Sequence, residues 1–446
     1  MKIEQIYDKA LAHGSYAIVS EGQVALVDPG RDPQPYLDFA EKHHGTIVAV
    51  FETHPHADFA SSHLEFQQRF GATVYINPKV GVSYPFLPLQ HGDEVRIGKV
   101  TFRALFTPGH SPDHNAYLLL DEAGKPHAVF TGDSLFVGDV GRPDLREGAG
   151  HVKANRKELA GMMYDTVNTV FAPLPDDVLV YPAHGAGSLC GKNMSTELYS
   201  TIGQQKEENW AFHVKEKQAF VESFLDGQPF IPKYFPYDVE LNRKGADPLA
   251  ESIERVPRLA SAEALEKGVL IVDTRNQEAF KAGHLNGALN IQNKEGDKFE
   301  TWLGALVSPT ESFYLVAEDE EALAAAIVRA AKIGYEKLIK GALVNPAQAP
   351  VKSDRLDLNE FKAHPERYTI VDIRNQSEVA TGKIFDSAVE IPLPELRDRS
   401  GELATDKPIV VHCAGGYRSA AGASILERKL AGATVYDLSE AVKEFK

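Results

Sequence analysis

Four short apolar segments in the first half of this chain each run into a loop that carries histidine or aspartate. They read TIVAVFETH, VTFRALFTPGH, HAVFTGDSLF and DDVLVYPAHGAG. An apolar run of roughly 4–8 residues bounded by turn residues is typical of a buried β-strand. Because a rigid sheet holds the loops at its strand ends in place, we expect these polar side chains to meet in one α/β domain that covers residues 1–250.

The loop residues are of the types that bind borderline metals such as zinc and iron. Neutral imidazole and carboxylate groups are natural ligands for these ions. A single buried histidine is more simply an ordinary core residue, but a set of them on consecutive strand ends indicates a metal site. The candidate set is His54, His56, Asp58, His110, Asp133 and His184.

The order of motifs, H-x-H-x-D, then T-P-G-H, T-G-D and P-A-H-G, resembles that of the metallo-β-lactamase superfamily. The resemblance implies an αββα sandwich with the metal at one edge of the sheets. Hydrolases of that superfamily have a histidine directly after the aspartate, where it helps to hold a second metal. This chain has Phe59 there, and phenylalanine cannot bind a metal, so we expect one metal ion instead of two.

One metal held by two histidines and one carboxylate, with open positions, is the arrangement of non-heme Fe(II) oxygenases. The best candidates for the three ligands are His54, His110 and Asp133. This arrangement resembles that of persulfide dioxygenases, and the resemblance implies one Fe(II) per chain. It also implies the activity, in which O2 oxidises the outer sulfur of a thiol persulfide to sulfite and frees the thiol.

Five further residues near this cluster are expected to orient ligands or to handle the substrate. His56 is either a fourth ligand or a hydrogen-bond donor to a ligand, and Asp58 and His184 would orient ligands and bound water. Arg142 stands in a segment that resembles the one carrying a substrate-binding arginine in persulfide dioxygenases, with a surface salt bridge as the alternative. Cys190 could accept or relay a persulfide, and a buried structural thiol is its alternative.

The second half of the chain contains an internal repeat. The sequence VDTRNQ at residues 272–277 returns as VDIRNQ at residues 371–376. A spacing of about a hundred residues is too long for a solenoid and matches two tandem copies of one small α/β domain. The Pro-bearing segment NPAQAPVKS lies between the copies, so we expect domains at residues 256–347 and 353–446.

The second copy contains the segment IVVHCAGGYRS, which reads as a strand, a C-x-x-G-x-R-S loop and a helix. The backbone N–H groups of a glycine-rich loop at a helix N-terminus favour an anion, here a thiolate or persulfide on Cys413. Arg418 adds positive charge. The motif resembles rhodanese sulfurtransferases, which implies a parallel sheet and sulfane sulfur as the cargo, with phosphate chemistry as the alternative. The loop residues expected to hold the substrate are Gly415, Gly416 and Ser419.

The first copy lacks these groups. Ala317 stands where the second copy has Cys413, and three acidic residues follow at positions 318–320. Asp273 and Arg275 of the repeated sequence are kept. This copy resembles the inactive rhodanese-homology domains of larger enzymes, which implies a scaffold or interface role and favours a homo-oligomer.

The composition narrows the classes of protein to which the chain can belong. A net charge of −16, with no cluster of lysine and arginine, argues against nucleic-acid binding. No apolar run approaches the roughly 20 residues of a membrane helix, and the N-terminus does not read as a secretory signal. We therefore expect no membrane partner and a cytoplasmic location, where the two cysteines, Cys190 and Cys413, remain reduced.

Together the two sites predict a fused sulfur-metabolism enzyme. The first would make sulfite from a low-molecular-weight thiol persulfide and O2, and Cys413 would add a sulfane sulfur to give thiosulfate, or run in reverse. Fusion keeps sulfite near its acceptor at a high effective concentration. The main alternative is a dinuclear-zinc hydroxyacylglutathione hydrolase-like thioesterase fused to a sulfurtransferase, and another is a sulfur carrier with a structural metal.

Overall fold

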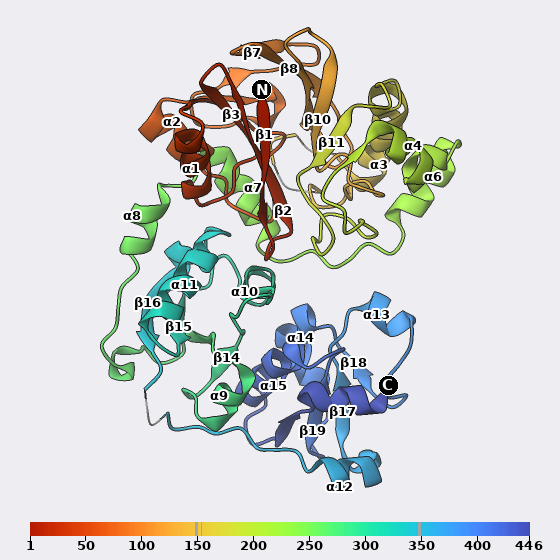
Figure 1. Cartoon of the computed structure of the whole chain (residues 1–446). Coiled ribbons are helices and arrows are strands. Elements are labelled where there is room, and N and C mark those ends of the chain that lie inside the picture. Colours follow the sequence, from red (N-terminus) through yellow and green to blue (C-terminus); the bar gives the residue numbers. More distant parts are fainter. Residues whose placement is uncertain (148–149, 153, 347–348) are drawn as a thin grey trace. The chain divides into compact units, whose positions relative to one another are not determined.

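The computed structural model describes residues 1–147, 150–152, 154–346 and 349–446. The chain divides into two compact units (Figure 1). The first comprises Met1–Ser252 and Lys332–Gly334, and the second comprises Ile253–Ala331 and Tyr335–Lys446. The expected division of the second unit at residues 256–347 and 353–446 stays a prediction, and residue 347 lies outside the described residues.

The first unit contains two six-stranded sheets, each in sequence order across the sheet. The first sheet runs β1 (Lys2–Asp8), β2 (His13–Ser20), β3 (Gln23–Val27), β4 (Thr46–Phe51), β5 (Thr73–Ile76) and β6 (Leu87–Pro88). Its first three strands are antiparallel and the others are parallel. The second sheet comprises β7 (Glu94–Ile97), β8 (Val100–Phe106), β9 (Asn115–Leu120), β10 (Pro126–Gly132), β11 (Leu179–Pro182) and β12 (Ser200–Thr201).

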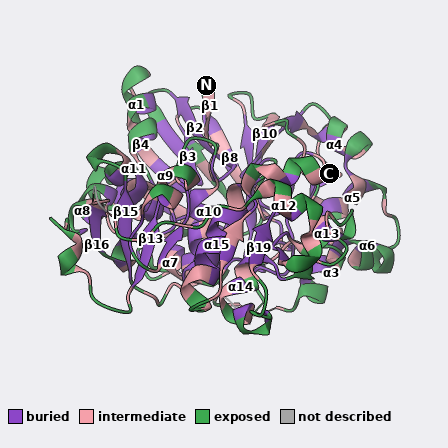
Figure 2. Cartoon of the chain, turned by 90° about the horizontal axis from the view of Figure 1, so that it is seen from below, coloured by how far each residue is buried: buried purple, intermediate pink, exposed green. Residues whose placement is uncertain are grey.

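The helices of the first unit are α1 (Gln34–Lys42), α2 (His63–Phe70), α3 (Arg156–Thr166), α4 (Ile202–Glu208), α5 (Trp210–His213), α6 (Lys217–Leu225), α7 (Phe235–Lys244) and α8 (Leu249–Glu254). The two sheets pack face to face around Phe51, Phe102 and Phe130. Helices α1 and α2 cover the outer face of the first sheet, and α3, α5 and α6 cover that of the second. The strands are mostly buried and the helices expose their outer sides (Figure 2). The predicted αββα sandwich is confirmed.

The second unit contains two four-stranded sheets in which every pair of neighbouring strands is parallel. The strands are β13 (Leu270–Asp273), β14 (Ala288–Asn290), β15 (Phe313–Ala317) and β16 (Ile339–Val344), then β17 (Thr369–Asp372), β18 (Val389–Glu390), β19 (Ile409–His412) and β20 (Val435–Asp437). Both sheets have the same strand order, 2-1-3-4 in sequence. The predicted pair of small parallel α/β folds is therefore confirmed.

Each repeat has one helix between successive strands, and the second repeat has an additional helix before its first strand. They are α9 (Gln277–Ala282), α10 (Phe299–Leu306) and α11 (Glu320–Ala331), then α12 (Leu358–Ala363), α13 (Gln376–Ala380), α14 (Leu393–Arg399) and α15 (Tyr417–Lys429). Short 3₁₀ turns and one π-helical segment, Val167–Phe171, complete the secondary structure. In the described part of the chain, no helix combines the length and the apolar character needed to span a bilayer.

The repeated V-D-x-R sequence forms the same buried ion pair in both repeats. Asp273 ends β13 and accepts hydrogen bonds from Arg275 at 2.7 and 3.0 Å, and Asp372 ends β17 and accepts the same bonds from Arg374. Each guanidinium also donates to a glycine carbonyl eight residues later in the chain. The pair thus ties the end of a central strand to the loop beyond the following helix, which gives the repeated sequence a structural cause.

Replacing Asp273 with alanine should destabilise the second unit by about 3–5 kcal/mol, because Arg275 would stay buried without its partner. Thermal unfolding followed by circular dichroism would show the transition of that unit at a lower temperature. The matched control is Glu266→Ala, which removes the exposed ion pair with Lys340 and should leave the transition nearly unchanged. Equal shifts for the two variants would contradict a structural role of the buried pair.

Candidate metal centre

Three strand ends of the first unit bring His54, His110 and Asp133 together. His54 follows β4, His110 follows β8, and Asp133 follows β10, and all three side chains are buried. The Nε2 atoms of the two histidines lie 3.8 and 3.6 Å from Asp133 Oδ2. All three candidate ligand atoms lie within 4.8 Å of one another. The structure therefore gathers the three side chains that the sequence singled out as metal ligands.

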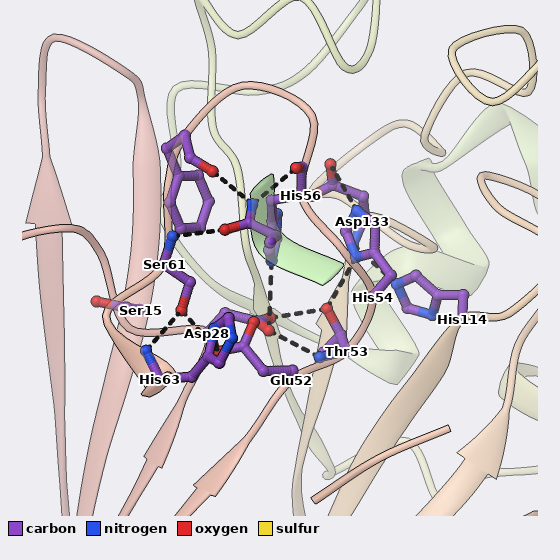
Figure 3. A network of polar contacts seen from close by, with 12 residues as sticks. Ser15, Asp28, Glu52, Thr53, His54, His56, Ser61, His63, His114 and Asp133 are labelled. Carbon is purple, nitrogen blue, oxygen red and sulfur yellow. Dashed lines mark hydrogen bonds and ion pairs between the residues drawn. The ribbon is translucent and has the colours of Figure 1, made fainter. Parts of the chain in front are cut away.

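The second ring nitrogen of each histidine is held by a neighbouring group. Thr53 Oγ1 donates to Asp28 Oδ2 at 2.8 Å, so it accepts from His54 Nδ1 at 3.0 Å (Figure 3). His110 Nδ1 donates to the backbone carbonyl of Arg142 at 2.9 Å. These bonds assign the proton to Nδ1 and leave Nε2 with a free lone pair, as metal-binding histidines require. Within the described residues, His54 Nε2 has no hydrogen-bond partner, so the residues fit a metal ion.

Burial sets the charge of these ligands. It lowers the pKa of His54 and of His110, so both imidazoles are neutral. Burial alone would raise the pKa of Asp133, but the neighbouring His184 outweighs it and the pKa of this carboxyl lies below its usual value. Two neutral imidazoles and one carboxylate are a donor set for iron or zinc.

His56, the second histidine of the H-x-H-x-D run, keeps the two roles that the sequence left open. Its Nε2 lies 3.3 Å from Asp28 Oδ1 (Figure 3). Its ring packs against Phe59, with centroids 4.4 Å apart, and Phe59 in turn contacts the ring of His13 at 3.8 Å. His56 can nevertheless offer a ligand atom within 4.8 Å of Asp133. No sequence motif contains His13, which begins β2 in the hairpin with β1.

Asp58 and His184 are linked to Asp133 through the ring of His184. His184 Nδ1 donates to Asp133 Oδ1 at 2.7 Å, and its Nε2 lies 2.9 Å from Asp58 Oδ2. Although burial alone would lower it, the two carboxylates raise the pKa of His184 to about 10. His184 therefore orients Asp133, in keeping with the orienting role that the sequence suggested.

His114 is a functional residue that the sequence analysis missed. Its Nδ1 lies 2.8 Å from Thr107 Oγ1, and its Nε2 accepts a hydrogen bond from the backbone N–H of Asp133 at 3.2 Å. The ring fits because residue 132 is Gly132, with φ +53°, where a Cβ would lie 2.5 Å from His114 Nε2. The only signal was a second histidine four residues after His110 in the same loop.

Arg142 is placed differently from the expectation. Its side chain is 1% exposed and forms a bidentate pair with Asp144, both bonds 2.7 Å long. The remaining N–H groups donate to the backbone carbonyls of Leu189, Pro229 and Phe230. Every donor of the guanidinium is used inside the protein, so this geometry argues against a substrate contact. Arg142 instead anchors the loop whose carbonyl holds His110.

Cys190 lies in the same pocket. Its residue is 1% exposed, and its Sγ atom lies within 4.8 Å of candidate ligand atoms of Asp58 and His184. Burial, together with the nearby carboxylates of Asp58 and Asp133, raises the pKa of the Cys190 thiol well above its ordinary value. The side chain is thus a neutral thiol beside the metal centre, and its role as a persulfide relay stays a prediction.

The Cys413 loop lies between β19 and α15 in the second unit. The backbone N–H of Gly416 donates to Cys413 Sγ at 3.1 Å, and Ser419 Oγ donates to the Gly416 carbonyl at 2.9 Å. Gly416 has φ +103°, and a Cβ there would lie 2.7 Å from the backbone nitrogen of Glu440. Gly415 has open space around it. The loop therefore points an N–H group of the helix N-terminus at the sulfur, as the motif predicts.

The arginine of this loop is balanced by a carboxylate. Arg418 donates two hydrogen bonds of 2.6 Å to Glu378. Its Cζ lies 5.9 Å from the ring centre of Trp302, which comes from the first repeat. Arg418 therefore adds a fixed charge beside Cys413 that a neighbouring acid partly compensates.

The register of the sheets confirms where the first repeat departs from the second. Asp273 pairs with Val316, as Asp372 pairs with His412 in the other repeat. Ala317 therefore occupies the strand-end position that Cys413 occupies. The first repeat has the strand and the helix of the loop, but no nucleophile between them.

Two family profiles match the chain. The metallo-beta-lactamase superfamily matches residues 9–184, and the rhodanese-like domain matches twice, at residues 259–343 and 357–446. The two families therefore meet in one chain, with the rhodanese-like sequence duplicated.

The chain resembles several named proteins over part of its length. The cytoplasmic hydroxyacylglutathione hydrolase of Arabidopsis thaliana is 33% identical over 38% of this chain, which spans 62% of that relative's length. A probable hydroxyacylglutathione hydrolase of Schizosaccharomyces pombe is 30% identical over 42% of this chain and 76% of its own length. A crystal structure of a metallo-beta-lactamase from Staphylococcus aureus subsp. aureus COL is 29% identical, with a TM-score of 0.69, and covers 78% of this chain and 99% of its own. That coverage extends beyond the first unit.

Replacing Thr53 with valine should weaken metal binding by roughly 10–100-fold, because His54 would lose the group that fixes its tautomer and ring orientation. Titration of the metal-free protein with Fe(II) or Zn²⁺ would measure the affinity. Thr101→Val, the same substitution near the start of β8, is the matched control. An unchanged affinity in Thr53→Val would mean that the hydrogen bond does not orient the ligand.

Proposed function

The chain belongs to the metallo-beta-lactamase superfamily, and on this basis we propose that its first unit oxidises a thiol persulfide with O2 while its second unit transfers sulfane sulfur through Cys413. The observation that carries the proposal is Phe59. Its side chain is fully buried between the rings of His13 and His56, so the position after Asp58 offers no ligand atom for a second metal of the hydrolase type.

His54, His110 and Asp133 would hold the metal, and the bonds from Thr53 and from the Arg142 carbonyl keep both imidazoles turned toward it. Ferrous iron in such a set supplies the one-electron chemistry that O2 needs before it can react with a sulfur anion. The set of two imidazoles and one carboxylate is the one that non-heme Fe(II) oxygenases use, and it leaves positions for two reactants. The thiol carrier of the persulfide would be a small molecule.

The overall reaction balances as R–S–SH + O2 + H2O → R–SH + SO3²⁻ + 2 H⁺. The S–S bond breaks, the outer sulfur loses four electrons, and O2 takes them up. His184 lies between Asp58 and Asp133, and these two carboxylates raise its pKa, so it would hold a proton beside the ligand Asp133.

Cys413 would carry out the transfer step. Its thiolate attacks the outer sulfur of a second persulfide, which breaks that S–S bond, releases R–SH and leaves a Cys413 persulfide. Sulfite then takes the outer sulfur, so that thiosulfate leaves and the Cys413 thiolate returns. The N–H of Gly416, at 3.1 Å from Sγ, stabilises the sulfur anion in both steps, and Arg418 adds positive charge. The reverse direction uses the same groups.

The second candidate function is a thioesterase with a zinc pair. The names of two relatives support it, since the Arabidopsis protein is named a hydroxyacylglutathione hydrolase and the Schizosaccharomyces protein a probable one. Asp58 and His184, which serve a second metal in such hydrolases, are both present and close together. The two candidates differ in their metal and in whether O2 is consumed.

The test is metal analysis of anaerobically purified protein, combined with O2 uptake on glutathione persulfide. The proposal predicts about one iron per chain, because the triad offers one complete ligand set. It also predicts O2 uptake that disappears in His110→Ala. His213→Ala, which removes an exposed histidine of α5, is the matched control and should keep full uptake. Two zinc ions per chain with thioester hydrolysis and no O2 uptake would establish the alternative.

The Cys413→Ser variant tests the coupling of the two units. It should consume O2 at the normal rate, because Cys413 belongs to a separate site, but it should release sulfite where the unaltered chain releases thiosulfate. Separation of the products by ion chromatography would measure this. Thiosulfate formed at an unchanged rate by Cys413→Ser would rule out the transfer step.

A further inference from the structure

The segment that follows β20 packs directly against the Cys413 loop. A Cβ on Gly416 would lie 2.7 Å from the carbonyl carbon of Ser439 and 2.7 Å from the nitrogen of Glu440, so the two backbones are in contact. The N–H of the same glycine donates to Cys413 Sγ at 3.1 Å. The place of residues 439–440 therefore decides where Gly416 lies and where its N–H group points.

Ser439 has a backbone conformation that needs support from its neighbours. Its φ is +51°, in the left-handed region that residues with a Cβ seldom adopt. Its N–H donates to Asp437 Oδ1 at 2.8 Å, and its Oγ donates to Asp437 Oδ2 at 2.6 Å. The shape of this turn thus depends on the position of the Asp437 carboxylate.

Lys281, which lies in α9 of the first repeat, holds that carboxylate. Its ammonium lies 2.8 Å from Asp437 Oδ2 and donates to Ser439 Oγ at 2.6 Å. The side chains of Lys281 and Asp437 are 13% and 3% exposed, so water and salt screen the pair only weakly. The repeated sequence places Ala380 of the second copy opposite Lys281. The first copy therefore carries, at this position, a cation that the second copy lacks and that reaches the second copy's fold.

A second contact from the first repeat reaches the next residue of the Cys413 loop. The Tyr417 hydroxyl donates to the backbone carbonyl of Gln292 at 3.1 Å, and the Gln292 side chain accepts from the N–H of Gln277 at 3.0 Å. Gln277 begins α9, the helix that also carries Lys281. Two consecutive residues of the loop are thus connected to one helix of the first repeat.

We propose that Lys281 is a positioning residue for Cys413: it fixes the turn at Ser439, against which Gly416 keeps its N–H on the sulfur. The inference rests on the proposed sulfur transfer and gives the first repeat a part in it, although that repeat has Ala317 at the position of the nucleophile. Arg418 is held by Glu378 within the second repeat. Loss of Lys281 should therefore slow the transfer step and leave the binding of an anionic substrate unchanged.

Sulfur transfer from thiosulfate to cyanide isolates the Cys413 step, because it needs neither iron nor O2. The Cys413 thiolate takes the outer sulfur of thiosulfate and releases sulfite, and cyanide then removes that sulfur as thiocyanate. In Lys281→Met, kcat should fall by roughly two- to tenfold, the effect of one hydrogen bond, while the KM for thiosulfate stays within about twofold. Lys340→Met, which removes the exposed pair with Glu266 from the same repeat, is the matched control and should keep its kcat.

The double variant Lys281→Met/Asp437→Asn keeps the test decisive if the single variant fails to fold. Lys281→Met leaves the Asp437 carboxylate buried without its cation, and Asp437→Asn removes that unpaired charge. The double variant still lacks the ammonium on Ser439, so its kcat should stay low. A normal kcat in a folded variant without Lys281, or a loss of kcat/KM that comes from KM, would overturn the proposal.

Alkylation of Cys413 by iodoacetamide at neutral pH separates this inference from the proposed function. The reaction needs the thiolate that the Gly416 N–H stabilises but no sulfur transfer, and mass spectrometry of the Cys413 peptide follows it. The rate should fall in Lys281→Met and not in Lys340→Met. An unaltered chain that forms no thiocyanate would count against sulfur transfer, whereas the slower alkylation would still support the positioning. Alkylation that is unchanged or faster in Lys281→Met would overturn it.

Discussion

The two oxygens of the Asp133 carboxylate serve different neighbours, and the first unit is arranged around that division. Oδ2 faces the free ring nitrogens of His54 and His110, whereas Oδ1 accepts a hydrogen bond from His184. The bond from His184 orients the carboxylate, and His114 holds the backbone of the same residue by accepting a hydrogen bond from its N–H. The αββα sandwich makes this possible, since β4, β8 and β10 from two packed sheets all end at one edge and deliver their loops to the same point.

Short sequence patterns predicted those parts of the arrangement that depend on neighbouring residues. An apolar run that ends in a polar loop identifies both the strand and the residue that the strand delivers, which is how His54, His110 and Asp133 were found. The V-D-x-R repeat predicted two copies of one fold, and the register of β15 and β19 confirms that Ala317 and Cys413 are equivalent. In each case the information lies within about ten residues of chain.

The parts that could not be predicted depend on contacts between distant segments. The sequence around Arg142 does not show its partners, because the backbone carbonyls of residues 189, 229 and 230 that accept hydrogen bonds from its guanidinium lie far along the chain. His114 likewise becomes part of the centre only because the loop after β8 meets the backbone of Asp133 after β10. Burial also affects the protonation of each group, and no sequence pattern shows whether a particular ring nitrogen is buried.

Both cysteines of the chain are buried, each beside groups that hold its sulfur. The outer surface therefore presents no thiol to the surrounding medium. In a medium that contains polysulfides or oxidised small thiols, an exposed reactive thiol collects mixed disulfides and cross-links to other chains. Because both sulfurs of this chain lie at enclosed positions, its surface offers no cysteine for such modification.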